Sequence, residues 1–200
     1  MTEVIANPPR QSEHPIDQDI LARWSPRAFD GSTLDEQTLL AVLEAARWAP
    51  SAFNYQPWRF VYELRDGPHW EEFLSILLPF NAAWAKDASG LVFILSDRLI
   101  SAPGKTETTP ATTGSFDAGA AWGLFALQAA KLGLHSHAMA GFDHDSAEST
   151  LGTAGRYRVE AAVAIGRIGD PENLPEALRA REVPSQRRPI AETAFRARLP

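Results

Sequence analysis

The chain has 200 residues, 44% of them hydrophobic, a formal net charge of −6 and no cysteine. This length and composition suffice for one domain with a substantial core. The lack of cysteine excludes disulfides, thiolate nucleophiles, thiolate zinc sites and iron–sulfur clusters. The acidic balance argues against a general nucleic-acid partner, and no stretch is long enough to span a membrane. We therefore expect a soluble, cytoplasmic protein with no nucleic-acid or membrane partner.

The domain organisation predicted is simple. Residues 1–15 are expected to form a mobile N-terminal arm, because this segment is polar and lacks an apolar signal-peptide core. Residues 16–200 are expected to form one domain. Thr33 and Glu36 fit a capping box, which predicts the start of a helix that Pro50 ends.

Further along the chain, helical and strand-like segments alternate without a repeat. Apolar patterning predicts strands at 59–63, 91–95 and 157–165, and helices at 70–78 and 116–132, the last ended by Gly133. Residues 101–114 are rich in Thr, Pro, Gly and Ser, which is typical of an irregular segment, and we expect a lid there. The tail from Gly169 has too few apolar residues to fold on itself, so we expect it to wrap another surface.

Two short segments near the start carry the strongest functional indication. The first, Arg23-Trp24-Ser25-Pro26-Arg27, brackets a hydroxyl with two guanidinium groups, which suits a phosphate. The second, residues 49–58, ends a helix at Pro50 and then offers amide, hydroxyl and aromatic groups on a turn. Within it, we interpret Trp58 as a structural anchor of the core.

These two motifs, in this order and spacing, resemble the nitroreductase family of FMN-dependent oxidoreductases. The resemblance continues at Asn81, at Gly133-Leu134 leading to Gly141-Phe142, and at Arg187-Arg188-Pro189. It implies an α+β sandwich with a mostly antiparallel sheet flanked by helices. It also implies an intertwined homodimer with two flavins at the interface, in which the C-terminal tail wraps the dimer.

The resemblance also implies which residues bind FMN: Arg23, Trp24, Ser25, Arg27, Pro50, Ser51, Ala52, Asn54, Asn81, Met139, Ala140, Gly141, Arg187 and Arg188. The arginines and Ser25 are expected at the phosphate and ribityl chain, with Arg188 favoured over Arg187. Ser51 and Asn54 are expected at the flavin of the opposite subunit. Asn81 is expected at the pyrimidine edge, and the backbone around Gly141 near N5.

Each of these motifs also has a purely structural interpretation. The arginines of the first motif and of the tail can be surface ion-pair partners, Asn81 a helix or turn amide, and Gly141 a plain turn glycine. A patch of His135, His137 and the acidic residues that follow lacks the usual ligand spacings, so no metal is expected.

The resemblance implies an enzyme that takes hydride from NADH or NADPH by a ping-pong mechanism. Its acceptor would be an electron-poor small molecule such as a nitroaromatic, a quinone or an activated alkene. The cofactor supplies the chemistry, so no side chain is assigned as a general acid or base. The alternatives are a reductive dehalogenase or flavin-destroying enzyme of the same fold, or a flavin-binding module without turnover.

Overall fold

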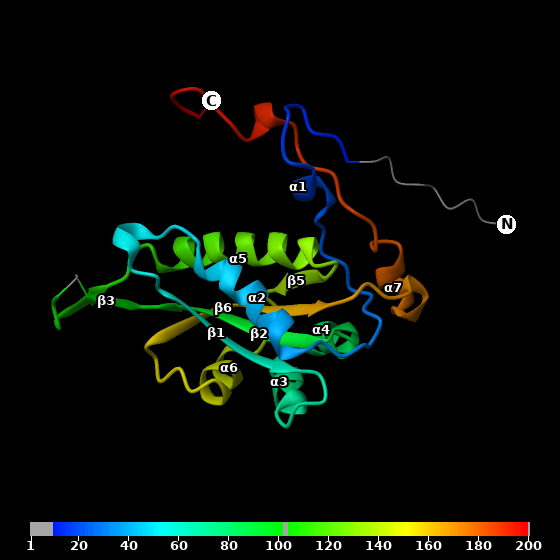
Figure 1. Cartoon of the computed structure of the whole chain (residues 1–200), viewed down its shortest axis with the longest axis horizontal. Coiled ribbons are helices and arrows are strands. Elements are labelled where there is room, and N and C mark those ends of the chain that lie inside the picture. Colours follow the sequence, from blue (N-terminus) through cyan, green and yellow to red (C-terminus); the bar gives the residue numbers. More distant parts are fainter. Residues whose placement is uncertain (1–9, 102–103, 200) are drawn as a thin grey trace.

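The computed structural model describes residues 10–101 and 104–199 (Figure 1). Its helices and strands, in chain order, are α1 (Gln18–Ala22), α2 (Glu36–Arg47), η1 (Ala52–Asn54), β1 (Trp58–Leu64), α3 (Trp70–Ile76), α4 (Pro79–Ala85), β2 (Gly90–Asp97), β3 (Leu99–Ser101), β4 (Thr108–Pro110), α5 (Gly114–Lys131), β5 (His135–Met139), α6 (His144–Thr150), β6 (Tyr157–Gly166), η2 (Pro171–Asn173), α7 (Glu176–Arg179) and η3 (Ile190–Glu192).

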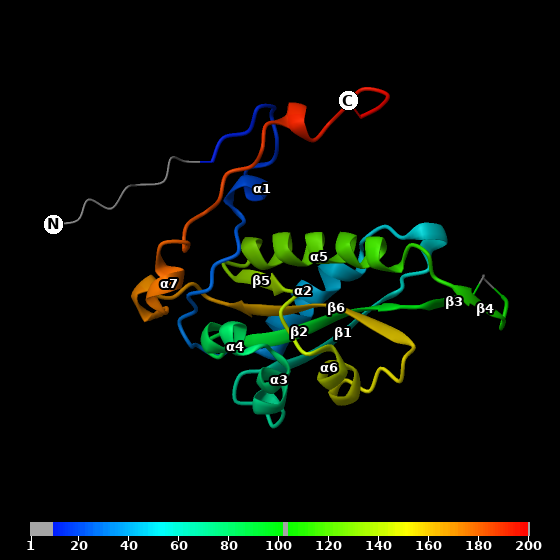
Figure 2. The same ribbon diagram turned by 180° about the vertical axis from the view of Figure 1, so that it is seen from behind.

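Four strands form one sheet in the order β1-β2-β6-β5, and every neighbouring pair is antiparallel. In this register Phe93 lies opposite Val61 on one side and Ala162 on the other. Helices α2 and α5 cover one face of the sheet, and α3, α4 and α6 cover the other (Figures 1 and 2). The predicted α+β sandwich with an antiparallel sheet is therefore confirmed.

Strand β2 contributes side chains to the cores on both faces of the sheet. All eight of its residues are buried, as the unbroken apolar run predicts. Because successive side chains point to opposite faces, Val92 and Ile94 pack in the core under α2 and α5. Leu91 and Phe93 pack in the second core, under α3, α4 and α6. Trp58, at the start of β1, is 5% exposed in the first core, so its interpretation as an anchor is confirmed.

The start of α2 corrects one prediction. Its N-cap is Asp35, whose carboxylate accepts from the Thr38 N–H at 2.9 Å and the Thr38 hydroxyl at 2.7 Å. The predicted capping box of Thr33 and Glu36 is therefore wrong. An ionised carboxylate one residue before the helix satisfies the free N–H groups better than a hydroxyl two residues further away.

Helix α5 ends as predicted, because Gly133 adopts a left-handed backbone (φ 72°) just after it. The segment predicted to be an irregular lid is more regular than expected. Strands β3 and β4 pair as an exposed antiparallel hairpin, with Ile100 opposite Thr109. Neighbouring Thr and Pro residues permit a short edge hairpin when the strands are only three residues long.

The terminal segments run side by side away from the sandwich (Figures 1 and 2). The Glu13 carboxylate accepts from the Ile190 N–H at 2.9 Å, which joins the described end of the predicted arm to the tail. Phe195 and Leu199 of the tail are exposed. Within residues 10–101 and 104–199, no helix is long and apolar enough to cross a membrane.

Candidate functional site

A cavity of 370 Å³ lies where α1, β5 and the tail meet, at the C-terminal end of α5. An ion pair between Lys131 of α5 and Asp19 of α1 fixes α1 at this end of the helix. Arg23 follows α1 directly as its C-cap, so the first motif enters the cavity wall. The residues lining the cavity, which we call the arginine cavity, are Arg10, Arg23, Trp24, Ser25, Arg27, His137, Arg181, Val183, Ser185 and Arg187.

The electrostatics of the arginine cavity are one-sided. Five of its ten lining residues are arginines, and none of the ten is an Asp or Glu. Burial lowers the pKa of Arg23, and the positive charge of Arg187 lowers it further. The pKa of Arg27 is lowered by burial and by Arg181. Glu182, behind the lining, raises the pKa of Arg27 in part, but the lining itself holds only positive charge, which is the chemistry that suits an anion.

Glu182 lies just behind this wall and organises the first motif. Its Oε1 accepts from the N–H groups of Arg27 at 2.6 Å and Ala28 at 2.8 Å. Its Oε2 lies 4.0 Å from Nη1 of Arg27 and makes no hydrogen bond in the described chain. The side chain is 1% exposed, so this carboxylate is held by the motif and not by solvent. It therefore fixes the backbone from which Arg27 projects.

Strand β5 connects the arginine cavity to the next part of the site. His137 Nδ1–H donates to the Pro26 carbonyl oxygen at 2.9 Å, which ties the first motif to the strand. Trp24 lies edge-on to His135, with ring centroids 6.1 Å apart. Burial is the main cause that lowers the pKa of His137, so the ring is neutral at pH 7.

Two predicted site residues meet just after β5. The Asn81 Nδ2 donates to the Gly141 carbonyl oxygen at 2.9 Å, and the Leu78 N–H donates to the same oxygen at 3.1 Å. A Cβ on Gly141 would come within 2.6 Å of Asn81 Nδ2 and 2.7 Å of the Phe80 ring, so glycine is needed for close approach. Asn81 is buried inside α4, where its amide organises the turn at 140–141.

The second motif forms a tight turn with unusual backbone angles. Phe53, Asn54 and Gln56 all adopt left-handed conformations, with φ of 48°, 56° and 51°. Such conformations cost free energy for residues other than glycine and cluster at functional sites. Ser51 Oγ accepts from the Gln56 N–H at 3.0 Å, and the Asp117 carboxylate accepts from the Ala52 N–H at 3.4 Å. These contacts hold the turn against the N-terminal end of α5.

The two motifs therefore lie at opposite ends of one helix (Figure 1). Asp117 contacts the second motif, and Lys131 contacts α1 beside the first motif. Lys131 lies fourteen residues after Asp117, a separation of about 21 Å at the α-helical rise. A single copy of the chain therefore keeps the first motif well away from the second.

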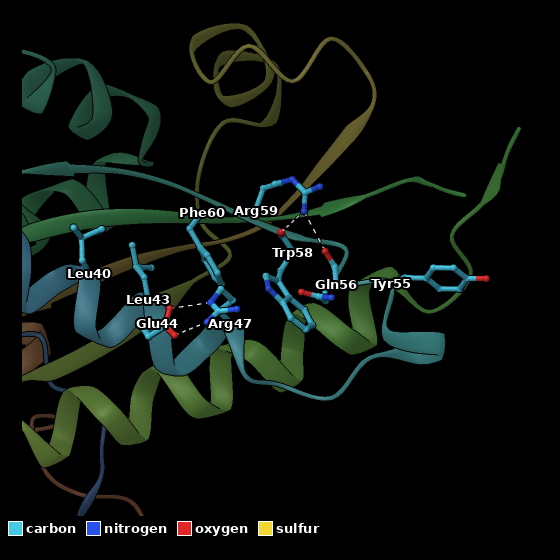
Figure 3. Close-up of a pocket in the computed structure, with 9 residues that line it drawn as sticks. All are labelled: Leu40, Leu43, Glu44, Arg47, Tyr55, Gln56, Trp58, Arg59 and Phe60. Carbon is cyan, nitrogen blue, oxygen red and sulfur yellow. Dashed lines mark hydrogen bonds and ion pairs between the residues drawn. The ribbon is translucent and has the colours of Figure 1, made fainter. Parts of the chain in front are cut away.

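A second cavity, of 640 Å³, is a groove between α2 and β1 (Figure 3). Its lining residues are Leu40, Leu43, Glu44, Arg47, Tyr55, Gln56, Trp58, Arg59 and Phe60. Arg47 forms an exposed bidentate pair with Glu44, and this pairing lowers the pKa of Glu44 to about 2. The charges on the α2 side of this groove are therefore paired within the lining, whereas the lining of the arginine cavity contains no carboxylate.

The predicted FMN-binding residues fall into four places. Arg23, Trp24, Ser25, Arg27 and Arg187 line the arginine cavity. Arg188, favoured over Arg187 by the sequence, instead lines a neighbouring 330 Å³ cavity that Arg187 also reaches. Asn81, Met139, Ala140 and Gly141 lie in α4 or at the end of β5. Pro50, Ser51, Ala52 and Asn54 lie at the far end of α5.

Sequence reasoning missed four residues around the arginine cavity: Arg10, His137, Arg181 and Glu182. They come from the predicted arm, from β5 and from the tail, and no local spacing links them to the first motif. Within residues 10–101 and 104–199, no group of three or more His, Cys, Asp or Glu side chains is placed to hold a metal ion.

The comparisons with known proteins agree on one family. The family model described as the nitroreductase family matches residues 20–74. A solved structure of an oxidoreductase containing FMN is 48% identical, covers 96% of each chain and has a TM-score of 0.92. A protein of Rhodopseudomonas palustris (strain TIE-1), provisionally named NADH dehydrogenase/NAD(P)H nitroreductase, is 27% identical over 80% of this chain and 87% of its own length. A provisionally named nitroreductase from Desulfovibrio desulfuricans, solved with FMN, is 25% identical over 94% of this chain and 100% of its own, with a TM-score of 0.68.

Proposed function

The chain belongs to the nitroreductase family, and from this premise we propose that it is an FMN-dependent oxidoreductase. It takes hydride from NADH or NADPH and reduces an electron-poor small molecule such as a nitroaromatic, a quinone or an activated alkene. The two substrates use the same site in turn. The observation that carries this proposal is the arginine cavity, where the first motif meets Arg187.

The donor set of the cavity fits the phosphate of FMN. A phosphate monoester carries close to two negative charges at neutral pH and three acceptor oxygens. Arg23 and Arg27 offer permanent charge and paired N–H groups, and the Ser25 hydroxyl lies 3.3 Å from Arg23 Nη1. Glu182 holds the Arg27 backbone without lining the cavity. These residues would bind the phosphate and part of the ribityl chain.

The turn after β5 fits the flavin ring. Strand β5 leads from His137, in the cavity wall, to Ala140 and Gly141 in four residues. Asn81 fixes this turn through its hydrogen bond to the Gly141 carbonyl oxygen. Gly141 has no Cβ, so its backbone can lie directly against Asn81 and Phe80. The backbone at 139–141 and the Asn81 amide would therefore face the ring. Bound FMN supplies the hydride chemistry, while these residues bind and orient it.

The second motif would complete the site of a second copy of the chain. Within one chain it lies about 21 Å along α5 from the first motif, by the helical rise. The solvent side of α5 carries Phe116, which is 81% exposed, and Gly119 and Gly123, beside which a Cβ would meet open space. An exposed apolar helix face of this kind needs a partner to bury it. A homodimer with two shared flavin sites accounts for both features.

The test begins with the purified protein. We expect a yellow protein that releases FMN on denaturation, identified by its retention time against FMN and FAD standards. Steady-state oxidation of NADH or NADPH should then depend on an added quinone or nitroaromatic. FMN without turnover on any acceptor would favour a flavin-binding module, and selective dehalogenation of a halogenated aromatic would favour the dehalogenase alternative. Absence of any bound or bindable flavin would overturn the proposal.

A further inference from the structure

Arg10 lies in the segment before α1 and reaches into the wall of the arginine cavity. Its Nε donates to the Ser185 carbonyl oxygen at 2.9 Å. Its Nη1 donates to the carbonyl oxygens of Leu21 at 2.9 Å and Arg23 at 2.6 Å. One guanidinium group thus joins the N-terminal segment, the end of α1 and the tail, and these three bonds fix its position beside the cavity.

The surroundings of Arg10 are positively charged. Burial lowers its pKa, and the positive charges of Arg187 and Arg23 lower it further. Its hydrogen-bond acceptors are backbone carbonyls, which carry no net charge. None of the ten residues lining the cavity is a carboxylate. Gathering like charges in this way is unfavourable, and an anion bound among them would relieve the repulsion between Arg10, Arg23 and Arg187.

We propose that Arg10 is a phosphate-binding residue, through which the N-terminal segment closes the phosphate end of the flavin site. The inference rests on the proposed function, since the phosphate in question is that of FMN. Arg10 lies outside both motifs and before residues 20–74, which the family model matches. It is therefore a feature of this chain that the family resemblance does not assign.

The test compares FMN with riboflavin, which lacks the phosphate. Dissociation constants for both flavins are measured by fluorescence for the wild type and for Arg10→Ala, Arg10→Lys and Arg65→Ala. Arg65 is the matched control, because its Nη1 also donates to two backbone carbonyls, of Lys86 and Ala88, but it does not line the cavity. Thermal melting of each variant checks that the fold is retained.

We expect Arg10→Ala to raise the FMN dissociation constant on the order of tenfold, as loss of one charge-assisted hydrogen bond does. Riboflavin affinity should change less than about twofold, which is a smaller change than the loss of such a hydrogen bond would cause. Arg10→Lys keeps the charge and should retain part of the preference for FMN, and Arg65→Ala should leave it unchanged.

Two results would overturn the inference. If Arg10→Ala weakens the binding of both flavins equally and Arg10→Lys restores neither affinity, Arg10 only connects segments of the chain. Unchanged FMN affinity in both Arg10 variants would remove it from the site. A wild-type protein that binds neither flavin would instead contradict the proposed function, so the two failures are distinguishable.

Discussion

The two ends of α5 differ in what they offer a ligand. At the C-terminal end, five arginines converge on a cavity without a carboxylate in its lining. At the N-terminal end, the turn of the second motif has strained backbone angles, and the adjoining groove contains an internally paired Arg47 and Glu44. One end gathers positive charge, and the other presents a turn with a fixed, unusual backbone. In the proposed function, these two ends contact different parts of one flavin.

This difference gives the long helix a role beyond packing. It keeps the halves about 21 Å apart within a chain, at the helical rise between Asp117 and Lys131. A two-fold dimer along α5 would bring the anion-binding end of one copy to the shaped turn of the other. The predictions below test whether the two ends serve one site, and then what each end contributes.

Mixed dimers should give the largest effect. An Arg23→Ala chain is combined with an Asn54→Ala chain, each of which should be weakly active alone. If the two residues serve one site across the interface, each mixed dimer has one intact site and one doubly damaged site. Activity should return to about half of the wild type per dimer, the sites being independent. The measurement is NAD(P)H oxidation by co-purified, differently tagged chains.

The matched control for the mixed dimers pairs Arg23→Ala with Arg27→Ala. Both residues line the same cavity, so every site stays damaged and no activity should return. Lack of rescue in the Arg23 and Asn54 pairing as well would mean that both motifs act within one chain, against the arrangement inferred from α5.

The arginine cavity itself should discriminate between flavins. Arg23→Ala removes a guanidinium from the anion-binding end and should raise the FMN dissociation constant at least about tenfold, while leaving riboflavin affinity nearly unchanged. Asn54→Ala acts at the other end and should weaken both flavins alike. Arg98→Ala is the control, since Arg98 is an exposed partner of Glu148. Equal losses of FMN and riboflavin in Arg23→Ala would contradict the phosphate assignment.

A smaller effect is expected where α5 holds the second motif. Asp117→Asn replaces a buried carboxylate that accepts from the Ala52 N–H and the Thr113 hydroxyl. The left-handed turn then loses a support worth about 1 kcal/mol, and both flavins should bind several-fold more weakly. The FMN to riboflavin ratio should stay constant in the fluorescence titration. Asp143→Asn is the control. It also removes a carboxylate that accepts from a backbone N–H, at the N-cap of α6, but away from the second motif.

The β3–β4 hairpin lies at the same end as the second motif, since Leu99, Ile100 and Tyr55 line one 210 Å³ cavity. Deleting residues 104–107 should leave FMN affinity and dimerisation unchanged, because both rest on other segments. The ranking of acceptors by kcat/KM should shift by a few-fold, as expected of an element that sets specificity. An unchanged ranking would make the hairpin a connector and leave substrate choice to α5.

Local patterns were enough to predict much of this molecule. An unbroken apolar run predicts the strand at 91–95, and a long stretch rich in small residues that ends at Gly133 predicts the helix at 116–132. No local pattern predicts the seven-residue helices α4 and α6. They depend on burying Trp84 and Ala147 against the sheet, which is a tertiary effect.

The candidate site likewise has a part that a local motif predicts and a part that depends on tertiary contacts. The first motif is contiguous, so resemblance could assign Arg23, Ser25 and Arg27 together. Arg10 and Glu182 reach the same cavity only after the arm and the tail fold beside it, and no spacing in the sequence records that. The preference for Arg188 over Arg187 also depended on register alone, whereas the fold directs Arg187 into the arginine cavity.

The smallest expected effect concerns pH and strand β5, which leads from the arginine cavity to Gly141. Burial lowers the pKa of both His135 and His137, so each ring is neutral when folded and takes up a proton more readily when unfolded. Stability from these groups is therefore fully present above their unfolded pKa of about 6.5 and is lost as pH falls below it. The melting temperature should decline from pH 7.5 to 5.5, and His137→Gln should flatten that decline. His69→Gln, at an exposed histidine just before α3, should not. A decline equally steep in the His137 variant would mean that other groups control the acid sensitivity of the cavity end.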